Sequence, residues 1–156
     1  MKSRAMKLQL AAGLLLMSFC LPLTASEQDR DYLAQLEQAE RTWHAAGLAG
    51  YRYTLIKGGV FGHSECEVRV GKGRCTARSR FTFQQPELWQ RAKCDGLTMP
   101  ELISQVREQL VKGTRHVELK LDAAVGYIVE FSAEPDTELP DQDWYVQIKQ
   151  FRSWSW

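Results

Sequence analysis

The chain has 156 residues, of which 44% are hydrophobic and 25% are charged, a composition that suits one folded domain with its own core. Its 20 Lys and Arg residues nearly balance its 19 Asp and Glu residues, which argues against a general nucleic-acid-binding protein. No Ser-, Gly- or Pro-rich linker divides the chain, and no motif in it specifies a reaction.

The first 25 residues predict an export signal. A short basic region (Lys2, Arg4, Lys7) precedes an uncharged apolar stretch over residues 8–23, and the chain turns polar at Ser26. The secretory machinery reads this order. We expect a signal peptide over 1–25 and a mature periplasmic or secreted domain over 26–156, without a membrane span. The mature domain keeps 17 basic and 19 acidic residues, a net charge of −2.

Cys20 leaves an alternative in which the mature chain begins at this cysteine and carries a lipid anchor. A lipobox requires a small residue directly before the cysteine, and the large Phe19 stands there. We therefore favour cleavage before Ser26 over lipidation.

A helix is expected over residues 26–47. Ser26 and Asp29 resemble a capping box at its start, and Gly47 suits its end. Apolar residues at three- and four-residue spacing predict one buried stripe: Tyr32, Leu36, Ala39, Trp43 and Ala46.

Three strands are expected next, because apolar and polar residues alternate over 51–55, 66–70 and 75–83. Lys72-Gly73 is the expected two-residue loop between the second and third strands. This loop pairs Val70 with Cys75 and Cys66 with Ser79.

A second helix should begin at Thr98, where Thr98 and Glu101 form a capping box, and end near Gly113. Strands follow over 116–122, 127–132 and 144–151, with a polar, acidic loop over 133–143 before the last one. One helix followed by three strands occurs twice along the chain, and this order predicts an α+β fold with a duplicated αβββ unit. Both helices should pack on one face of an antiparallel sheet.

The chain resembles the bacterial domain-of-unknown-function family 6174 over residues 32–151. The resemblance is carried by the segments 51–55, 68–73, 98–102, 122–127 and 143–145. It implies a small exported or lipid-anchored envelope protein, and it implies no reaction, catalytic residue or cofactor. The chain departs from the family pattern at Ile128, where a proline is common, and at 58–62, where a cysteine pair is common.

The mature chain keeps Cys66, Cys75 and Cys94. In the expected register Cys66 and Cys75 are about 13 Å apart, and a disulfide needs Cα atoms within about 7 Å. We therefore favour a Cys75–Cys94 disulfide. Two alternatives remain open: three reduced thiols, or a register with residues 70–71 in the loop, which places Cys66 opposite Cys75.

Charge patterning gives the leading functional hypothesis. Alternation places five arginines on the sheet face opposite the aromatic core: Arg52, Arg69, Arg74, Arg78 and Arg80. Such a face could hold an anionic partner, namely phosphate, a lipid headgroup or an acidic protein surface, which suggests a non-catalytic envelope protein that binds a partner. The charge pattern by itself favours a different interpretation, a solvated face whose charges are neutralised by the acidic loop over 133–143, because acidic and basic stretches of similar size coexist in the chain.

Two other function classes have less support. An enzyme would need a site assembled from scattered residues such as His63, Glu65 and Asp122, and no nucleophile–base spacing favours it. Residues 63–67 lack the further donors that a structural metal site needs, so neither a metal nor a cofactor is expected. An inhibitor-like module with a concave sheet rests on fold analogy alone.

Overall fold

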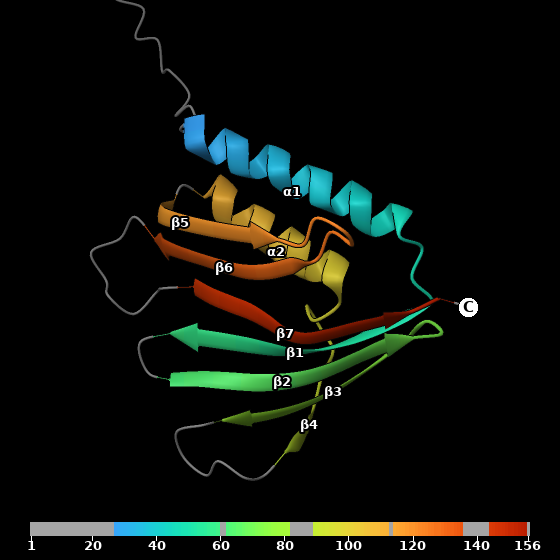
Figure 1. The fold of residues 1–156 in the computed structure, drawn as a ribbon. Helices are drawn as coiled ribbons and strands as arrows, with labels where there is room; N and C mark the ends of the chain where they lie inside the picture. The colour runs from blue at the N-terminus through green and yellow to red at the C-terminus, as the bar shows by residue number, and fades with distance from the viewer. Residues whose placement is uncertain (1–26, 60–61, 82–88, 113, 136–143, 156) are drawn as a thin grey trace, which may run out of the picture.

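The computed structural model describes residues 27–59, 62–81, 89–112, 114–135 and 144–155. Within these ranges the chain has an α+β fold with two helices and a seven-stranded antiparallel sheet (Figure 1). The elements are α1 (Glu27–Ala45), β1 (Gly50–Gly59), β2 (Gly62–Gly71), β3 (Arg74–Phe81), β4 (Gln90–Ala92), α2 (Met99–Val111), β5 (Thr114–Leu121), β6 (Ile128–Pro135) and β7 (Trp144–Trp154). The strand order is β4-β3-β2-β1-β7-β6-β5, so the two halves of the chain meet where β1 pairs with β7.

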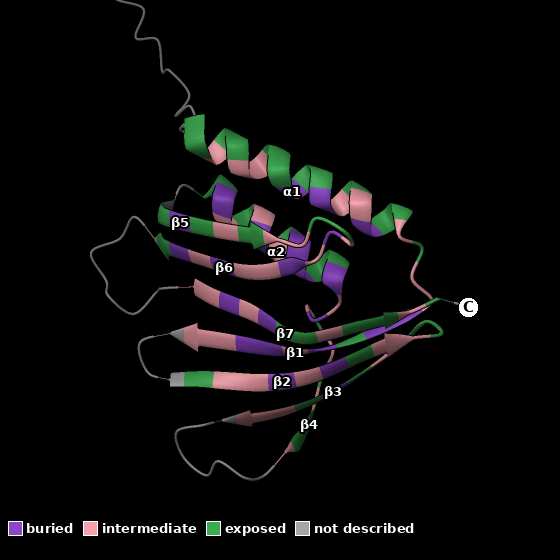
Figure 2. Ribbon diagram, viewed as in Figure 1, coloured by how far each residue is buried: buried purple, intermediate pink, exposed green. Residues whose placement is uncertain are grey.

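One face of the sheet is buried against both helices (Figure 2). On β1 the predicted alternation is present: Tyr51, Tyr53 and Leu55 are 0–6% exposed, whereas Arg52 is exposed. Tyr51 touches both helices, since its ring lies 4.8 Å from that of Trp43 in α1 and its hydroxyl accepts a hydrogen bond from the first backbone N–H of α2. The helices therefore cover the aromatic face and leave the opposite face open.

Both tyrosines anchor the start of α2. The Tyr53 hydroxyl donates to the Leu97 carbonyl, just before the helix, while Tyr51 binds the backbone N–H of Met99. Burial raises the pKa of both phenols, so they remain neutral donors and acceptors across the ordinary pH range.

Helix α1 passes close to the turn between β5 and β6. Gly126 in that turn has φ +83°, and a side chain there would collide with the Ala39 carbonyl and the Trp43 backbone of α1. Leu36, Ala39 and Trp43 form the buried stripe of α1. Two further members of the predicted stripe, Tyr32 and Ala46, are only partly buried. Among the described residues, no helix has both the length and the apolar character needed to cross a membrane.

The predicted hairpin between β2 and β3 is confirmed. Val70 pairs with Cys75 and Cys66 pairs with Ser79, which leaves Lys72 and Gly73 as the loop. Their φ angles of +52° and +67° are typical of a type I′ turn.

The prediction missed β4, so four strands rather than three separate the helices. Some boundaries were also wrong: β5 begins at Thr114 and ends before Asp122, β6 continues to Pro135, and β7 continues to Trp154. Predictions that involve residues 1–26, 82–88, 113 and 136–143 lie outside the described residues.

Helix α2 begins with the predicted capping box. The Glu101 carboxylate accepts hydrogen bonds from the Thr98 backbone N–H at 2.8 Å and from the Thr98 hydroxyl at 2.6 Å. These hydrogen bonds lower the pKa of Glu101, because they favour its ionised form. Because the pKa of Glu101 is lowered by folding, the stabilisation that comes from these two hydrogen bonds is fully present above the pKa of the unfolded state. It is lost as the pH falls through the pKa of the folded state.

Replacing Thr98 by alanine should therefore cost about 1 kcal/mol near neutral pH and less in acid, where Glu101 is protonated. Urea denaturation of the wild type and Thr98→Ala at about pH 7 and about pH 3 measures this difference. Thr98→Ser, which keeps the hydroxyl, is the control. An equal loss at both pH values would mean that the hydroxyl does not act through the ionised carboxylate.

Candidate functional site

The five predicted arginines lie on the open face of the sheet, on β1, β2 and β3. The register gives this directly: Arg52 stands opposite Arg69, Glu67 opposite Arg78, and Glu65 opposite Arg80. Arg74 follows the hairpin loop and stands opposite Gly71. Arg52, Arg69, Arg74 and Arg78 are exposed, and Arg80 is half-buried.

Two of these arginines are neutralised within the sheet. Arg78 pairs with Glu67 at 2.5 Å, and Arg80 pairs with Glu65 at 2.5 Å. Both guanidinium groups also lie near the Trp89 ring, at 5.8 Å and 4.8 Å from its centroid. The carboxylates that pair with Arg78 and Arg80 come from the neighbouring strand β2. The alternative interpretation expected the acidic loop over 133–143 to supply these carboxylates. Residues 136–143 of that loop lie outside the described residues.

A groove of about 1200 Å³ lies on the open face, over β4, β3, β2, β1 and β7. Its lining contains six basic side chains, from Arg52, Arg69, Arg78, Arg91, Lys93 and Arg152, against two acidic ones, from Glu67 and Asp95. Arg74 and Arg80 do not line it. The groove thus keeps three of the five predicted arginines and adds Arg91, Lys93 and Arg152, which the sequence reasoning missed.

Arg152 reaches the groove because β7 contains a β-bulge. Arg52 pairs with Arg152 and Thr54 with Lys149, so Gln150 and Phe151 together stand opposite Tyr53. Gln150 has φ +54°, the left-handed conformation that the first residue of a G1-type bulge adopts. The bulge exchanges the two faces: Phe151 packs on Tyr51 and Tyr127 in the core, and Arg152 turns to the open face.

The sequence carries a signal for this bulge. Lys149 and Gln150 are consecutive polar residues between the core residues Ile148 and Phe151. Strict alternation would place Gln150 in the core. A break of this kind indicates one extra residue in the strand.

Arg91 is placed by β4 and held by the disulfide. Arg91 stands opposite Arg78 on β3, so its side chain shares the open face. Cys94, two residues after β4, is joined to Cys75 on β3 with a Cα–Cα distance of 6.0 Å. The structure thus contains the favoured pairing and leaves Cys66 as a buried free thiol.

Three groove arginines form a line across adjacent strands, which we call the arginine row: Arg152 on β7, Arg52 on β1 and Arg69 on β2. Neighbouring strands are about 4.8 Å apart, so the three Cα atoms span about 10 Å. All three side chains are exposed. Within the described residues, no carboxylate lies within the 4 Å of an ion pair from any of them.

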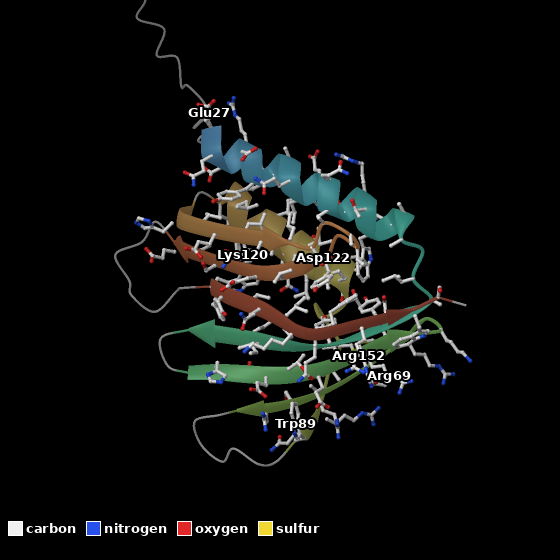
Figure 3. All side chains as sticks on the ribbon, viewed as in Figure 1. Glu27, Arg69, Trp89, Lys120, Asp122 and Arg152 are labelled. Carbon is white, nitrogen blue, oxygen red and sulfur yellow. A yellow bond between two sulfur atoms is a disulfide. The ribbon has the colours of Figure 1, made fainter. Side chains whose placement is uncertain are left out.

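Trp154 lies beside the arginine row, two residues from Arg152 along β7. Its indole lies over Gly50 and Gly71, the open-face residues next to the row on β1 and β2, and a Cβ at Gly50 would collide with the ring. The Arg69 guanidinium lies 5.7 Å from the centre of the same ring. Figure 3 shows Arg69 and Arg152 on the same side of the sheet, with Trp89 further along near β4.

The residues named for an enzyme site are not brought together. His63 and Glu65 lie on β2, and Asp122 follows β5 at the far edge of the sheet, with β1, β7 and β6 between them. Asp122 shapes its own turn by accepting hydrogen bonds from the backbone N–H groups of Ala124 and Val125. In the part of the chain that the structure describes, no three His, Cys, Asp or Glu residues could hold a metal ion.

The free thiol of Cys66 lies on the core side of β2, where burial raises its pKa. Burial also lowers the pKa of Lys57, on the neighbouring strand. A buried thiol with a raised pKa is a weak nucleophile, so Cys66 behaves as a small core residue.

Residues 35–153 match a family described as "Family of unknown function (DUF6174)". The chain belongs to this family. The match covers α1 from Gln35 onward, α2 and all seven strands as far as Ser153 of β7. In this member of DUF6174 the matched region therefore includes every residue of the arginine row. No curated protein matches the chain.

Proposed function

We propose that this protein is an exported, non-catalytic envelope protein that binds an anionic ligand or partner through the groove on its open sheet face. One observation carries the proposal: the groove has six basic side chains against two acidic ones, and its arginine row has no carboxylate partner among the described residues. Charges that are left unpaired on one concave surface attract an anion more strongly than charges spread over a convex surface.

Export is supported by two features. Residues 1–25 have the order of a secretory signal, and the Cys75–Cys94 disulfide suits an oxidising compartment. We place the mature chain in the periplasm or outside the cell, with lipid attachment at Cys20 as the less favoured alternative.

We also interpret the fold as a duplication, in which the second helix and its three strands repeat the first helix and its three strands, and β4 is an addition between the two units.

The groove is tested by charge reversal. The wild type should bind at least one of three anionic probes saturably, in a one-to-one complex: glycerol 3-phosphate, succinate or poly-glutamate. The double variant Arg91→Glu/Arg152→Glu should bind at least about tenfold more weakly, because it removes two of the six basic groups and adds two acids. Isothermal titration calorimetry at constant ionic strength measures both.

The matched control is Arg41→Glu/Arg74→Glu. It changes the net charge by the same amount, but Arg41 lies on α1 and Arg74 lies outside the groove. This control should bind like the wild type. Equal weakening in the two double variants would show a net-charge effect and no groove site. A wild type that binds none of the probes would also contradict the proposal.

A further inference from the structure

The arginine row is electrostatically unfavourable in the isolated protein. Arg152, Arg52 and Arg69 stand directly opposite one another on adjacent strands, and like charges in such cross-strand pairs are destabilising. The nearest acid in the register, Glu67, is taken by Arg78. Three positive charges therefore remain within a span of about 10 Å.

The backbone is distorted to complete this row. Without the bulge at Gln150, Arg152 would not share a face with Arg52. Gln150 has φ +54°, a left-handed backbone conformation that is strained for a residue other than glycine. β-Bulges are common beside functional sites, where they re-aim one side chain. Here the bulge has two consequences: it places Phe151 against the core, and it brings a third arginine next to two others on the open face.

The spacing and the donors favour a compact, multiply charged ligand. One bidentate carboxylate satisfies one guanidinium, whereas a phosphoryl group carries nearly two charges and three acceptor oxygens on one atom. The next position along the row is Thr76, opposite Arg69, and Gln150 also lines the groove. A hydroxyl and an amide add donors beside the guanidinium groups.

We propose that the arginine row binds a phosphoryl group, an inference that rests on the proposed anion-binding function of the groove. The group could belong to a soluble phosphate ester or to a lipid headgroup, since both present the same oxygens. Arg152, Arg52 and Arg69 donate to these oxygens, and the Trp154 ring restricts the orientation of Arg69.

The first test uses the charge of the ligand. Arginine stays protonated, whereas a phosphate monoester loses its second proton near about pH 6. Calorimetry with glycerol 3-phosphate at about pH 5 and about pH 7.5 should therefore show severalfold tighter binding at the higher pH. Sulfate keeps its two charges at both pH values, so its affinity should not change and it controls for titration of the protein.

Arg52→Ala should weaken glycerol 3-phosphate binding at least about tenfold. It should not lower the melting temperature, because it removes a residue that repels its two neighbours. Arg74→Ala, on the same face but outside the groove, should bind like the wild type. A melting temperature that falls markedly with Arg52→Ala would show a structural role and contradict the argument from repulsion.

Binding to lipid vesicles distinguishes a lipid headgroup from a soluble phosphate ester as the source of the phosphoryl group. Phosphatidylcholine vesicles that contain phosphatidic acid present the glycerol 3-phosphate group on a surface. Tighter binding per phosphate to these vesicles than to free glycerol 3-phosphate identifies a headgroup site, and equal or weaker binding identifies a soluble ester. Phosphatidylserine carries its phosphate only as a singly charged diester, so equal binding to vesicles that contain it instead would show recognition of surface charge rather than of a terminal phosphoryl group, and would overturn the inference.

Two outcomes separate this inference from the proposed function. If succinate or poly-glutamate binds as tightly as glycerol 3-phosphate at about pH 7.5, the groove binds anions but the phosphoryl inference is wrong. If no anionic probe binds, the proposed function fails as well.

Discussion

Replacing Phe131 by alanine is expected to lower the free energy of unfolding by about 3–5 kcal/mol. Phe131 on β6 is fully buried, and its ring contacts the Trp144 ring edge to face at 5.3 Å. The substitution removes this contact and leaves a cavity where α2 packs on β6. Because a domain of this size is stable by about 5–15 kcal/mol, the loss is a large part of the total. Urea denaturation followed by far-UV circular dichroism measures it.

Two variants control for this result. Val111→Ala, at the end of α2, changes a side chain that is 70% exposed and should cost less than about 0.5 kcal/mol. Phe131→Leu should fall between the two, because it keeps most of the apolar volume. A loss below about 1 kcal/mol for Phe131→Ala would show that the sheet and α2 do not pack tightly around this ring.

Loss of the Cys75–Cys94 disulfide should lower the free energy of unfolding by about 3 kcal/mol. The two cysteines are 19 residues apart, and the bond restricts that loop in the unfolded chain. The bond also holds β4, with Arg91, against β3, so the same loss should weaken anion binding in the groove. Urea denaturation and calorimetry of Cys75→Ser/Cys94→Ser measure the two effects.

Reducing agent provides the control for this prediction. It should destabilise the wild type by a similar amount and leave Cys75→Ser/Cys94→Ser unchanged. Intact mass of protein recovered from cells and labelled at thiols after denaturation should show a chain that begins at Ser26, with one labelled cysteine before reduction and three after. Three labelled cysteines before reduction would contradict the disulfide, and an acyl group at Cys20 would contradict cleavage before Ser26.

The hairpin between β2 and β3 was predictable because its information is local. Lys72 and Gly73 both adopt positive φ, and a two-residue loop of this type sets the register of every pair that follows. The register in turn placed Cys66 too far from Cys75 and left Cys94 as the partner. The positions of Arg52, Arg69 and Arg78 on the open face follow from the same alternation.

The rest of the groove was not predictable from alternation. Strand β4 has three residues, Gln90–Ala92, too few for a period to be seen, and it exists because it pairs with β3 and is tied to it through Cys94. Arg152 depends on a bulge that reverses the faces of β7 near its end. Strand β4 arises from contacts between distant segments, whereas the bulge has a local signal, the consecutive polar residues Lys149 and Gln150, that strict alternation ignores; Arg91 and Arg152 were therefore assigned no role.

The shortness of β4 also determines how this protein can meet other molecules. An exposed edge strand is a template for pairing with a second chain, and proteins limit this risk with short, charged edges. The described edge at β4 offers only three residues, of which Gln90 and Arg91 are exposed. Pairing with a second chain through the β4 edge is therefore disfavoured, and the longer edge strand of the sheet is β5, at the opposite end of the strand order.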